Sequence, residues 1–182
     1  ADLDTFTAKV KTAAAAHAQV ARTTIIPGRR YEYFDSLEKF REYEARGRRA
    51  LELAAPVAEK FKVALAVENH KDHRNEERVA LFKHIDNEYV GACVDTGNSV
   101  SLLEDPLETA QALAPWAHSV HLKDQAVQAY DDGFLLADIP LGQGCLPLKQ
   151  IVSLLRIAKP GIHFSLELIT RDPLKVPTHS KE

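Results

Sequence analysis

Short apolar runs alternate with amphipathic segments along most of the chain. Five runs rich in β-branched and small apolar residues have the length and composition of buried strands, and they lie at residues 19–26, 62–68, 89–95, 117–121 and 161–168. Apolar positions recur at helical spacing in four further segments, residues 2–17, 75–85, 106–114 and 147–158. This alternation predicts βα units built around a parallel sheet.

Two further segments complete the predicted organisation. Ser36 has the character of an N-cap, with Lys39 at the third helical position, and predicts a long helix that reaches about Lys60 and is broken or kinked at Pro56. The stretch 124–146 has no clear period and contains three of the eight glycines. We therefore predict a long irregular loop there, which could fold over a site as a lid.

Four of the predicted strands end on a carboxylate or an imidazole, at Glu68, Asp95, His121 and Glu167. Counted back in steps of two, the positions on the same face of each strand are mostly small or polar, whereas the opposite face carries Val, Leu, Ile and Phe. We expect the apolar face to pack on outer helices and the small face to line an interior with room near the strand ends. In a barrel of parallel strands, those carboxyl ends are where chemistry takes place.

The types of these four residues point to a cation. Three carboxylates and one imidazole make an oxygen-rich ligand set that favours Mn²⁺ or Mg²⁺, with Co²⁺ or Zn²⁺ as alternatives. The simpler interpretation is that each residue caps its own strand or satisfies nearby backbone groups. Recurrence at the same structural position in four strands favours the metal site.

Composition and charge exclude several classes of partner. A length of 182 residues fits a single domain. The net charge is −3 with acidic and basic residues interspersed, which argues against nucleic-acid and membrane partners. No apolar stretch approaches the roughly 18 residues of a membrane span. Only two cysteines are present, which favours a reducing, cytoplasmic environment.

Four motifs resemble the successive metal-ligand motifs of the xylose isomerase-like barrel family: Glu68-Asn69-His70, Asp95-Thr96-Gly97-Asn98, His121-Leu122-Lys123-Asp124 and Leu166-Glu167. The resemblance covers about residues 18–173 and implies an α/β fold, a (β/α) TIM-type barrel. It implies that strands three to seven are present, with the segment 19–26 as the third strand. Because full barrels need about 250 residues and the chain lacks methionine, we expect residues 1–182 to be one such domain truncated at both ends.

The resemblance also implies a function. Members of this family bind one divalent cation through residues that match Glu68, Asp95, His121 and Glu167, and they often form dimers, so a homodimer is one expectation. The implied activity is that of a divalent-metal-dependent isomerase or epimerase, which acts on a small keto sugar or its derivative through a metal-stabilised enediolate. Glu68 and Glu167 would be the catalytic acid/base pair. Epimerases of the family often have a histidine where this chain has Asn98, which can contribute only hydrogen bonds.

Five residues are candidates for contact with a sugar or sugar-acid substrate: Arg22, His70, Asn98, Lys123 and Arg171. For most of them a second role stays open. Arg22 could instead neutralise a ligand carboxylate, His70 could lie in a surface loop, and Lys123 could pair with Asp124. Arg171 could equally pair with Asp172.

Three rival functions remain at this point. Segments 131–134, 140–142 and 169–173 are similar to a branch of the family that contains 3-oxo-isoapionate decarboxylase, so the chain could belong to a metal-dependent decarboxylase of a 3-oxo sugar acid. A truncated barrel could also bind metal without turnover. The endonuclease branch of the family needs several zinc ions and a basic groove, which this acidic chain lacks.

Overall fold

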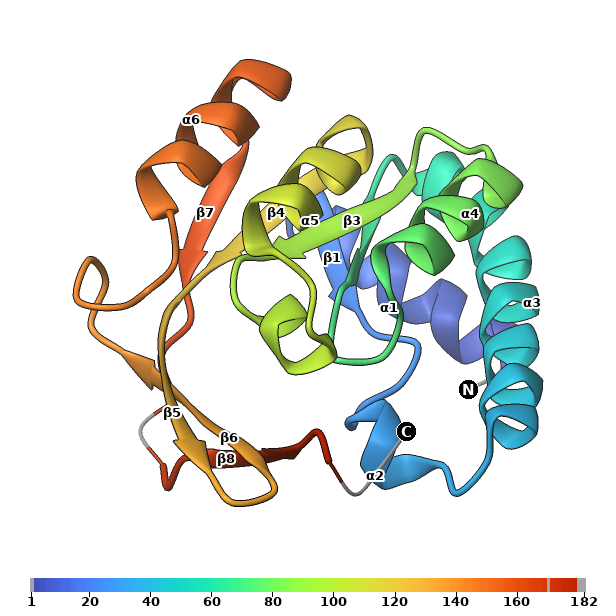
Figure 1. Ribbon diagram of the computed structural model, residues 1–182. Coiled ribbons are helices and arrows are strands. Elements are labelled where there is room, and N and C mark those ends of the chain that lie inside the picture. Colours follow the sequence, from blue (N-terminus) through green and yellow to red (C-terminus); the bar gives the residue numbers. More distant parts are fainter. Residues whose placement is uncertain (1, 170, 180–182) are drawn as a thin grey trace.

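A parallel sheet of five strands organises the molecule, and the computed structural model describes residues 2–169 and 171–179 (Figure 1). The strand order is β1-β2-β3-β4-β7, and all neighbouring pairs are parallel. The bounds are β1 (Val20–Thr23), β2 (Ala64–Glu68), β3 (Val90–Asp95), β4 (Ala117–Leu122) and β7 (His163–Leu166). β1 and β7 are the two edges, so over the described residues the sheet is an open half-barrel of the TIM type.

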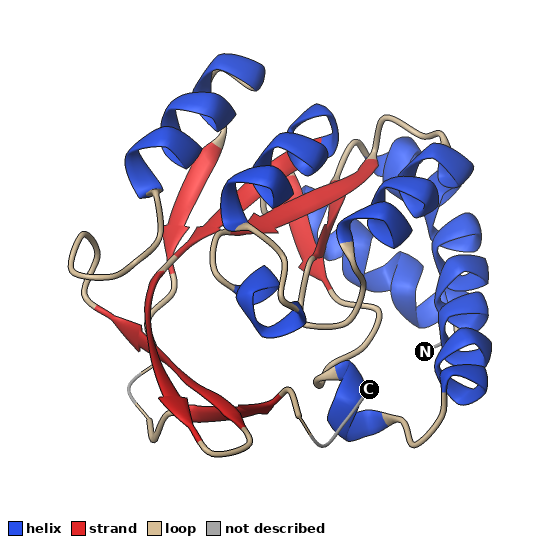
Figure 2. Ribbon diagram, viewed as in Figure 1, coloured by secondary structure: helices blue, strands red, loops and turns tan. Residues whose placement is uncertain are grey.

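Helices connect the strands and cover one face of the sheet (Figure 2). The α-helices are α1 (Leu3–Ala15), α2 (Arg30–Tyr33), α3 (Leu37–Phe61), α4 (Asn75–Ile85), α5 (Pro106–Leu113) and α6 (Leu148–Ala158). Two 3-10 turns are η1 (Asn98–Leu102) and η2 (Ala114–Trp116). The strand–helix alternation predicted from the sequence is confirmed, whereas the short α2, η1 and η2 were not predicted. No helix in the described part of the chain combines the length and apolarity that crossing a membrane would require.

The long helix α3 begins as predicted but does not break where predicted. The Ser36 side chain accepts a hydrogen bond from the backbone N–H of Lys39 and so caps the helix. The helix then continues through Pro56 to Phe61, so a break there is wrong, whereas the alternative of a kink stays a prediction. Buried residues Leu51 and Ala58 lie on either side of the proline. Their packing against the sheet offsets the free-energy cost of the helical hydrogen bond that the proline removes.

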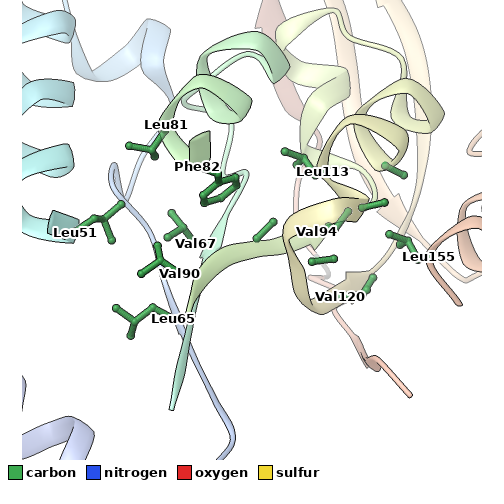
Figure 3. Close-up of a cluster of buried hydrophobic side chains, with 14 of the residues drawn as sticks. Leu51, Leu65, Val67, Leu81, Phe82, Val90, Val94, Leu113, Val120 and Leu155 are labelled. Atoms are coloured by element: carbon green, nitrogen blue, oxygen red, sulfur yellow. The ribbon is translucent and has the colours of Figure 1, made fainter. Parts of the chain in front are cut away.

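The apolar faces of the strands meet these helices in one core (Figure 3). Val67, Val94 and Val120 are fully buried and pack with side chains such as Phe82 of α4 and Leu113 of α5. Each such side chain contributes on the order of 1.5–3 kcal/mol through burial. The prediction that the apolar face packs on the helices is confirmed.

The segment predicted as an irregular loop is largely a second, antiparallel sheet. β5 (Asp124–Tyr130) and β6 (Gly133–Ile139) form a hairpin, and β8 (Leu174–Pro177) pairs with β6. The loop prediction is therefore wrong for β5 and β6, which a two-residue turn before Gly133 connects. A side chain at Gly133 would come within 2.1 Å of the Val176 carbonyl, so the close approach of β8 requires glycine. In Figure 1 this sheet lies on the side toward which the parallel strands point.

Candidate metal centre

The sheet brings the four predicted residues to one edge. Glu68 and Asp95 are the last residues of β2 and β3, and His121 lies beside Asp95 in the pairing of β3 with β4. Glu167 directly follows β7, and its backbone N–H donates to the Leu122 carbonyl at 3.0 Å, which extends the pairing of β4 with β7. Neighbouring parallel strands thus place all four side chains at their carboxyl ends.

The distances between these side chains suit a single ion. One ligand atom of each residue lies within 4.8 Å of those of the other three. Oxygens on opposite sides of a Mg²⁺ or Ca²⁺ ion are separated by about 4–5 Å, so the four atoms could bind one cation together. The residues are Glu68, Asp95, His121 and Glu167.

The same atoms lack hydrogen-bond partners. Within residues 2–169 and 171–179, Glu68 Oε2, Asp95 Oδ2, His121 Nδ1 and Glu167 Oε2 are buried without one. The three carboxylate oxygens form ion pairs of 2.7–3.0 Å with Arg22 or Lys123, and His121 Nδ1 lies 3.2 Å from Glu167 Oε2. Buried polar atoms without hydrogen bonds are rare in folded proteins. A divalent cation would satisfy all four at once, so the donor set fits the metal that the sequence predicts.

Neighbouring residues fix the orientation of Asp95. Its Oδ1 accepts hydrogen bonds from the backbone N–H groups of Gly97 (2.9 Å) and Asn98 (2.8 Å). The Asn69 side chain holds the Asp95 backbone through both its N–H (2.8 Å) and its carbonyl (3.0 Å). Only Oδ2 therefore remains to face the cluster. Burial raises the pKa of Asp95 to about 6, an effect that Lys123 opposes.

Asn98 fixes the orientation of the Glu68 carboxylate, and Arg22 neutralises its charge. The Asn98 Nδ2 group donates to Glu68 Oε1 at 3.1 Å, which leaves Oε2 directed at the cluster. Arg22 Nη1 lies 2.7 Å from Glu68 Oε2. Of the two roles open to Arg22 from the sequence, the structure shows the neutralisation of a carboxylate.

Lys123 joins the cluster rather than pairing with its neighbour in sequence. Its Nζ lies 3.0 Å from both Asp95 Oδ2 and Glu167 Oε2, so the alternative pairing with Asp124 is wrong. Successive strand residues point to opposite faces, which separates the two side chains. Asp124 instead accepts the backbone N–H groups of Gly142 and Gly144. Burial disfavours the charged form of Lys123, but the neighbouring carboxylates of Asp95 and Glu167 outweigh this effect and raise the pKa of Lys123.

Comparison with known proteins now identifies the family. The model for "Xylose isomerase-like TIM barrel" matches residues 1–182. The chain belongs to this family. The fold and the order of the strand-end residues agree with that membership.

Three individual relatives illustrate the breadth of the family. The 3-oxo-isoapionate decarboxylase of Pectobacterium atrosepticum is 28% identical over 119 residues, which are 64% of this chain and 43% of that protein. A xylose isomerase-like TIM barrel protein from Mycobacterium smegmatis, solved in complex with magnesium, is 22% identical with a TM-score of 0.72. D-psicose 3-epimerase from Clostridium cellulolyticum H10, solved with D-tagatose, is 16% identical with a TM-score of 0.71.

The structural matches cover most of this chain but a smaller part of each relative. The structural matches extend over 94% and 93% of this chain but only 61% and 56% of the two solved chains. The chain also spans less than half of the decarboxylase. At these identities the solved structures show the fold alone. The family includes sugar epimerases and a decarboxylase, so the activity of this chain is a matter for proposal.

The last two candidates for substrate contact, His70 and Arg171, lie around the site. His70 is half-buried, its backbone N–H donates to Asp72 Oδ1 at 3.2 Å, and burial lowers its pKa. Arg171 lines a small cavity together with Lys71 and Asp138. In the described residues Arg171 makes no ion pair with Asp172, so that alternative is wrong.

Sequence reasoning assigned no role to Cys93 and Lys71. Cys93 is fully buried one step below Asp95 on the same strand face, and its Sγ lies within 4.8 Å of ligand atoms of Glu68 and His121. Contacts with Cys93 and Glu167 raise the pKa of His121 to about 10. Because Cys93 lies two residues before Asp95 on the same face of the strand, the alternation of strand faces could have identified it as a neighbour of the cluster. Lys71 lies in a loop, where no periodic pattern points to it.

A large cavity lies elsewhere. It has a volume of about 450 Å³ and lies among residues of α2, η1 and β8, with Phe34, Leu102 and Val176 in its lining. None of the four strand-end residues lines it. The clustering of four possible metal-ligand atoms, rather than the size of a cavity, therefore locates the candidate site.

Proposed function

We propose that this chain carries the divalent-cation site of a sugar isomerase or epimerase that acts on a small keto sugar or its derivative. The observation that carries the proposal is the convergence of four ligand atoms from four strand ends within 4.8 Å of one another. Three carboxylates and one imidazole favour Mn²⁺ or Mg²⁺ over a closed zinc site.

Glu68 and Glu167 are the proposed proton carriers. They lie at the ends of strands that β3 and β4 separate, so they can approach a bound ligand from different directions. The bound cation would stabilise the negative charge that develops on substrate oxygens when the neighbouring C–H bond is broken. One glutamate accepts that proton at a carboxylate oxygen and the other returns a proton to the opposite face, which inverts the carbon.

The surrounding residues prepare these carboxylates. Asn98 holds Glu68 Oε1 and so fixes the direction of Oε2. Contacts with His121 and Lys123 keep the pKa of Glu167 below its usual range, so Glu167 is ionised. Glu68 is almost fully buried, which excludes water from one side of the reacting carbon.

Exchange of the C3 proton of ketoses into D₂O, followed by NMR with Mn²⁺ present, tests this function. We expect exchange by the unaltered chain and a loss of at least about 100-fold in Glu68→Gln and in Glu167→Gln. Glu88→Gln, at an exposed position, is the matched control and should keep full exchange. Full exchange in either site variant would rule out the assigned roles.

A decarboxylase of 3-oxo sugar acids is the second candidate. The relative from Pectobacterium atrosepticum favours it, and so does the presence of Arg22 and Lys123 beside the carboxylates. Release of CO₂ from 3-oxo sugar acids without proton exchange on ketoses would identify this activity. One bound Mn²⁺ with neither reaction would identify a barrel that binds metal without turnover.

A further inference from the structure

Lys71 is a buried cation without a counter-ion. It lies in the loop between β2 and α4, three residues after Glu68, and only 7% of it is exposed. Its ammonium donates a hydrogen bond to Asn98 Oδ1. Among the residues that the structure describes, no carboxylate lies within 4.0 Å of it, whereas the neighbouring Lys123 has two. A buried charge without a partner costs free energy, so a ligand that supplies the partner is expected.

The loop holds Lys71 in place at a conformational cost. Its φ angle is 58°, in the left-handed region that residues other than glycine rarely adopt. Asp72 fixes the loop on either side, because its Oδ1 accepts the N–H groups of His70 (3.2 Å) and His73 (2.8 Å). The Lys71 carbonyl accepts the Arg30 N–H at 3.0 Å. Backbone strain held by surrounding structure is typical of functional positions.

The charge balance of the site also calls for an anion. Three carboxylates face the cations Lys123 and Arg22, so the cluster has one excess negative charge when His121 is neutral, as a metal ligand must be. A divalent cation turns this into an excess positive charge, and Lys71 increases it. Lys71 and Lys123 both donate to Asn98 Oδ1. A neutral sugar would leave this positive charge unmatched.

A small cavity next to Lys71 is lined also by Arg171, Asp138 and Asp172. Its volume of about 10 Å³ holds about one water-sized atom. The two carboxylates disfavour an anion inside that cavity. An anion that meets the Lys71 ammonium would therefore approach from the side of Asn98, which links Lys71 to Glu68 of the cation cluster.

We propose that the Lys71 ammonium binds the carboxylate of the substrate, so that the site accepts a sugar acid in preference to a neutral sugar. The inference rests on the proposed function for the presence of the cation. It deepens that function by naming the substrate class. It also assigns a binding role to a residue outside the four metal-ligand candidates.

Binding of a matched acid and alcohol tests this role. Calorimetric titration of the Mg²⁺-loaded chain with threonate and with threitol should show tighter binding of the acid. In Lys71→Met the affinity for threonate should fall at least tenfold while that for threitol is unchanged. Lys83→Met, at an exposed position on α4, should bind both as the unaltered chain does. Because the cation itself attracts carboxylates, the decisive quantity is the change in the preference for acid over alcohol.

Thermal unfolding separates a binding role from a structural one. Without ligand, Lys71→Met should melt at a higher temperature than the unaltered chain, because it removes a buried unpaired charge and functional sites trade stability for activity. A lower melting temperature, or an unchanged preference for threonate, would contradict the inference. Tighter Lys71-dependent binding of glycerol phosphate than of threonate would contradict the choice of a carboxylate.

The inference and the proposed function can fail separately. Lys71-dependent binding of threonate without proton exchange or CO₂ release would support the inference and contradict the proposed function. Turnover of a neutral ketose that Lys71→Met leaves unchanged would do the reverse.

Discussion

Two clusters of charged residues, one at the strand ends and one around the loop that follows β2, differ in charge balance. The strand-end cluster contains Glu68, Asp95, His121 and Glu167 with Lys123 and Arg22. The loop cluster contains Asp72, Glu44 and Glu77 with Arg78, Arg41, Arg30 and His73. In the loop cluster three acids meet three arginines. In the strand-end cluster three acids meet only two cations when His121 is neutral, as a metal ligand must be.

This difference separates a structural cluster from a site that needs a ligand. Arg78 and Asp72 are both fully buried and lie 2.6 Å apart, so each charge has a direct partner. Although burial opposes ionisation, Arg78 and His73 hold the pKa of Asp72 well below its usual range. The strand-end cluster instead brings four ligand atoms of different residues within 4.8 Å of one another, close enough to share one cation. We therefore expect the loop cluster to govern folding stability and the strand-end cluster to govern cation binding.

The largest effect on stability should come from Arg78→Met. It leaves Asp72 buried without its main partner, and removing one member of a buried pair typically costs about 3–5 kcal/mol. Denaturant unfolding measures the loss, and Lys83→Met should show none. The double variant Asp72→Asn/Arg78→Met should recover part of the stability. A loss below about 1 kcal/mol would contradict a structural role for this pair.

A smaller effect should come from the cation. At a Mg²⁺ or Mn²⁺ concentration of 100 times Kd, binding stabilises the folded chain by about 2.7 kcal/mol. Asp95→Asn should abolish this increment, because it removes one of the three carboxylates. Without metal the same variant should be as stable as the unaltered chain or slightly more stable. Thermal unfolding with and without EDTA makes the comparison.

The smallest effect should be a dependence of stability on pH in the loop cluster. Hydrogen bonds from His73 and Arg41 lower the pKa of Glu44 from 4.5 to about 2. A depressed pKa stabilises the fold above the unfolded value, so this contribution is complete above about pH 4.5 and is lost as the pH falls toward 2. We expect up to about 2 kcal/mol, allowing for partial exposure of Glu44. Glu44→Gln should flatten stability over that interval, and an unchanged profile would contradict the pairing.

The parts of the fold that could be predicted are those set by local patterns. The helix predicted at 75–85 matches α4 in both bounds, because capping and periodicity act within a few residues. The four ligand candidates were found because each ends a strand. In contrast, β8 and the hairpin depend on pairings between distant segments, which no local period encodes.

Within the site, the errors have the same origin. The contacts of Lys123 with Asp95 and Glu167 join three different strand ends, and sequence adjacency suggested Asp124 instead. Lys71 lies in a loop with a left-handed backbone, so neither strand nor helix periodicity placed it. The strand pattern could thus predict which four side chains cluster at the strand ends, but it could not predict the surrounding cations.

Equilibrium titration with Mn²⁺, followed by electron paramagnetic resonance of the free ion, tests the central claim most directly. One saturable Mn²⁺ per chain is predicted, with binding abolished or weakened at least tenfold in Asp95→Asn and in Glu167→Gln and unchanged in Glu88→Gln. Absence of saturable binding, or equal binding by Asp95→Asn, would contradict a shared cation at the strand ends.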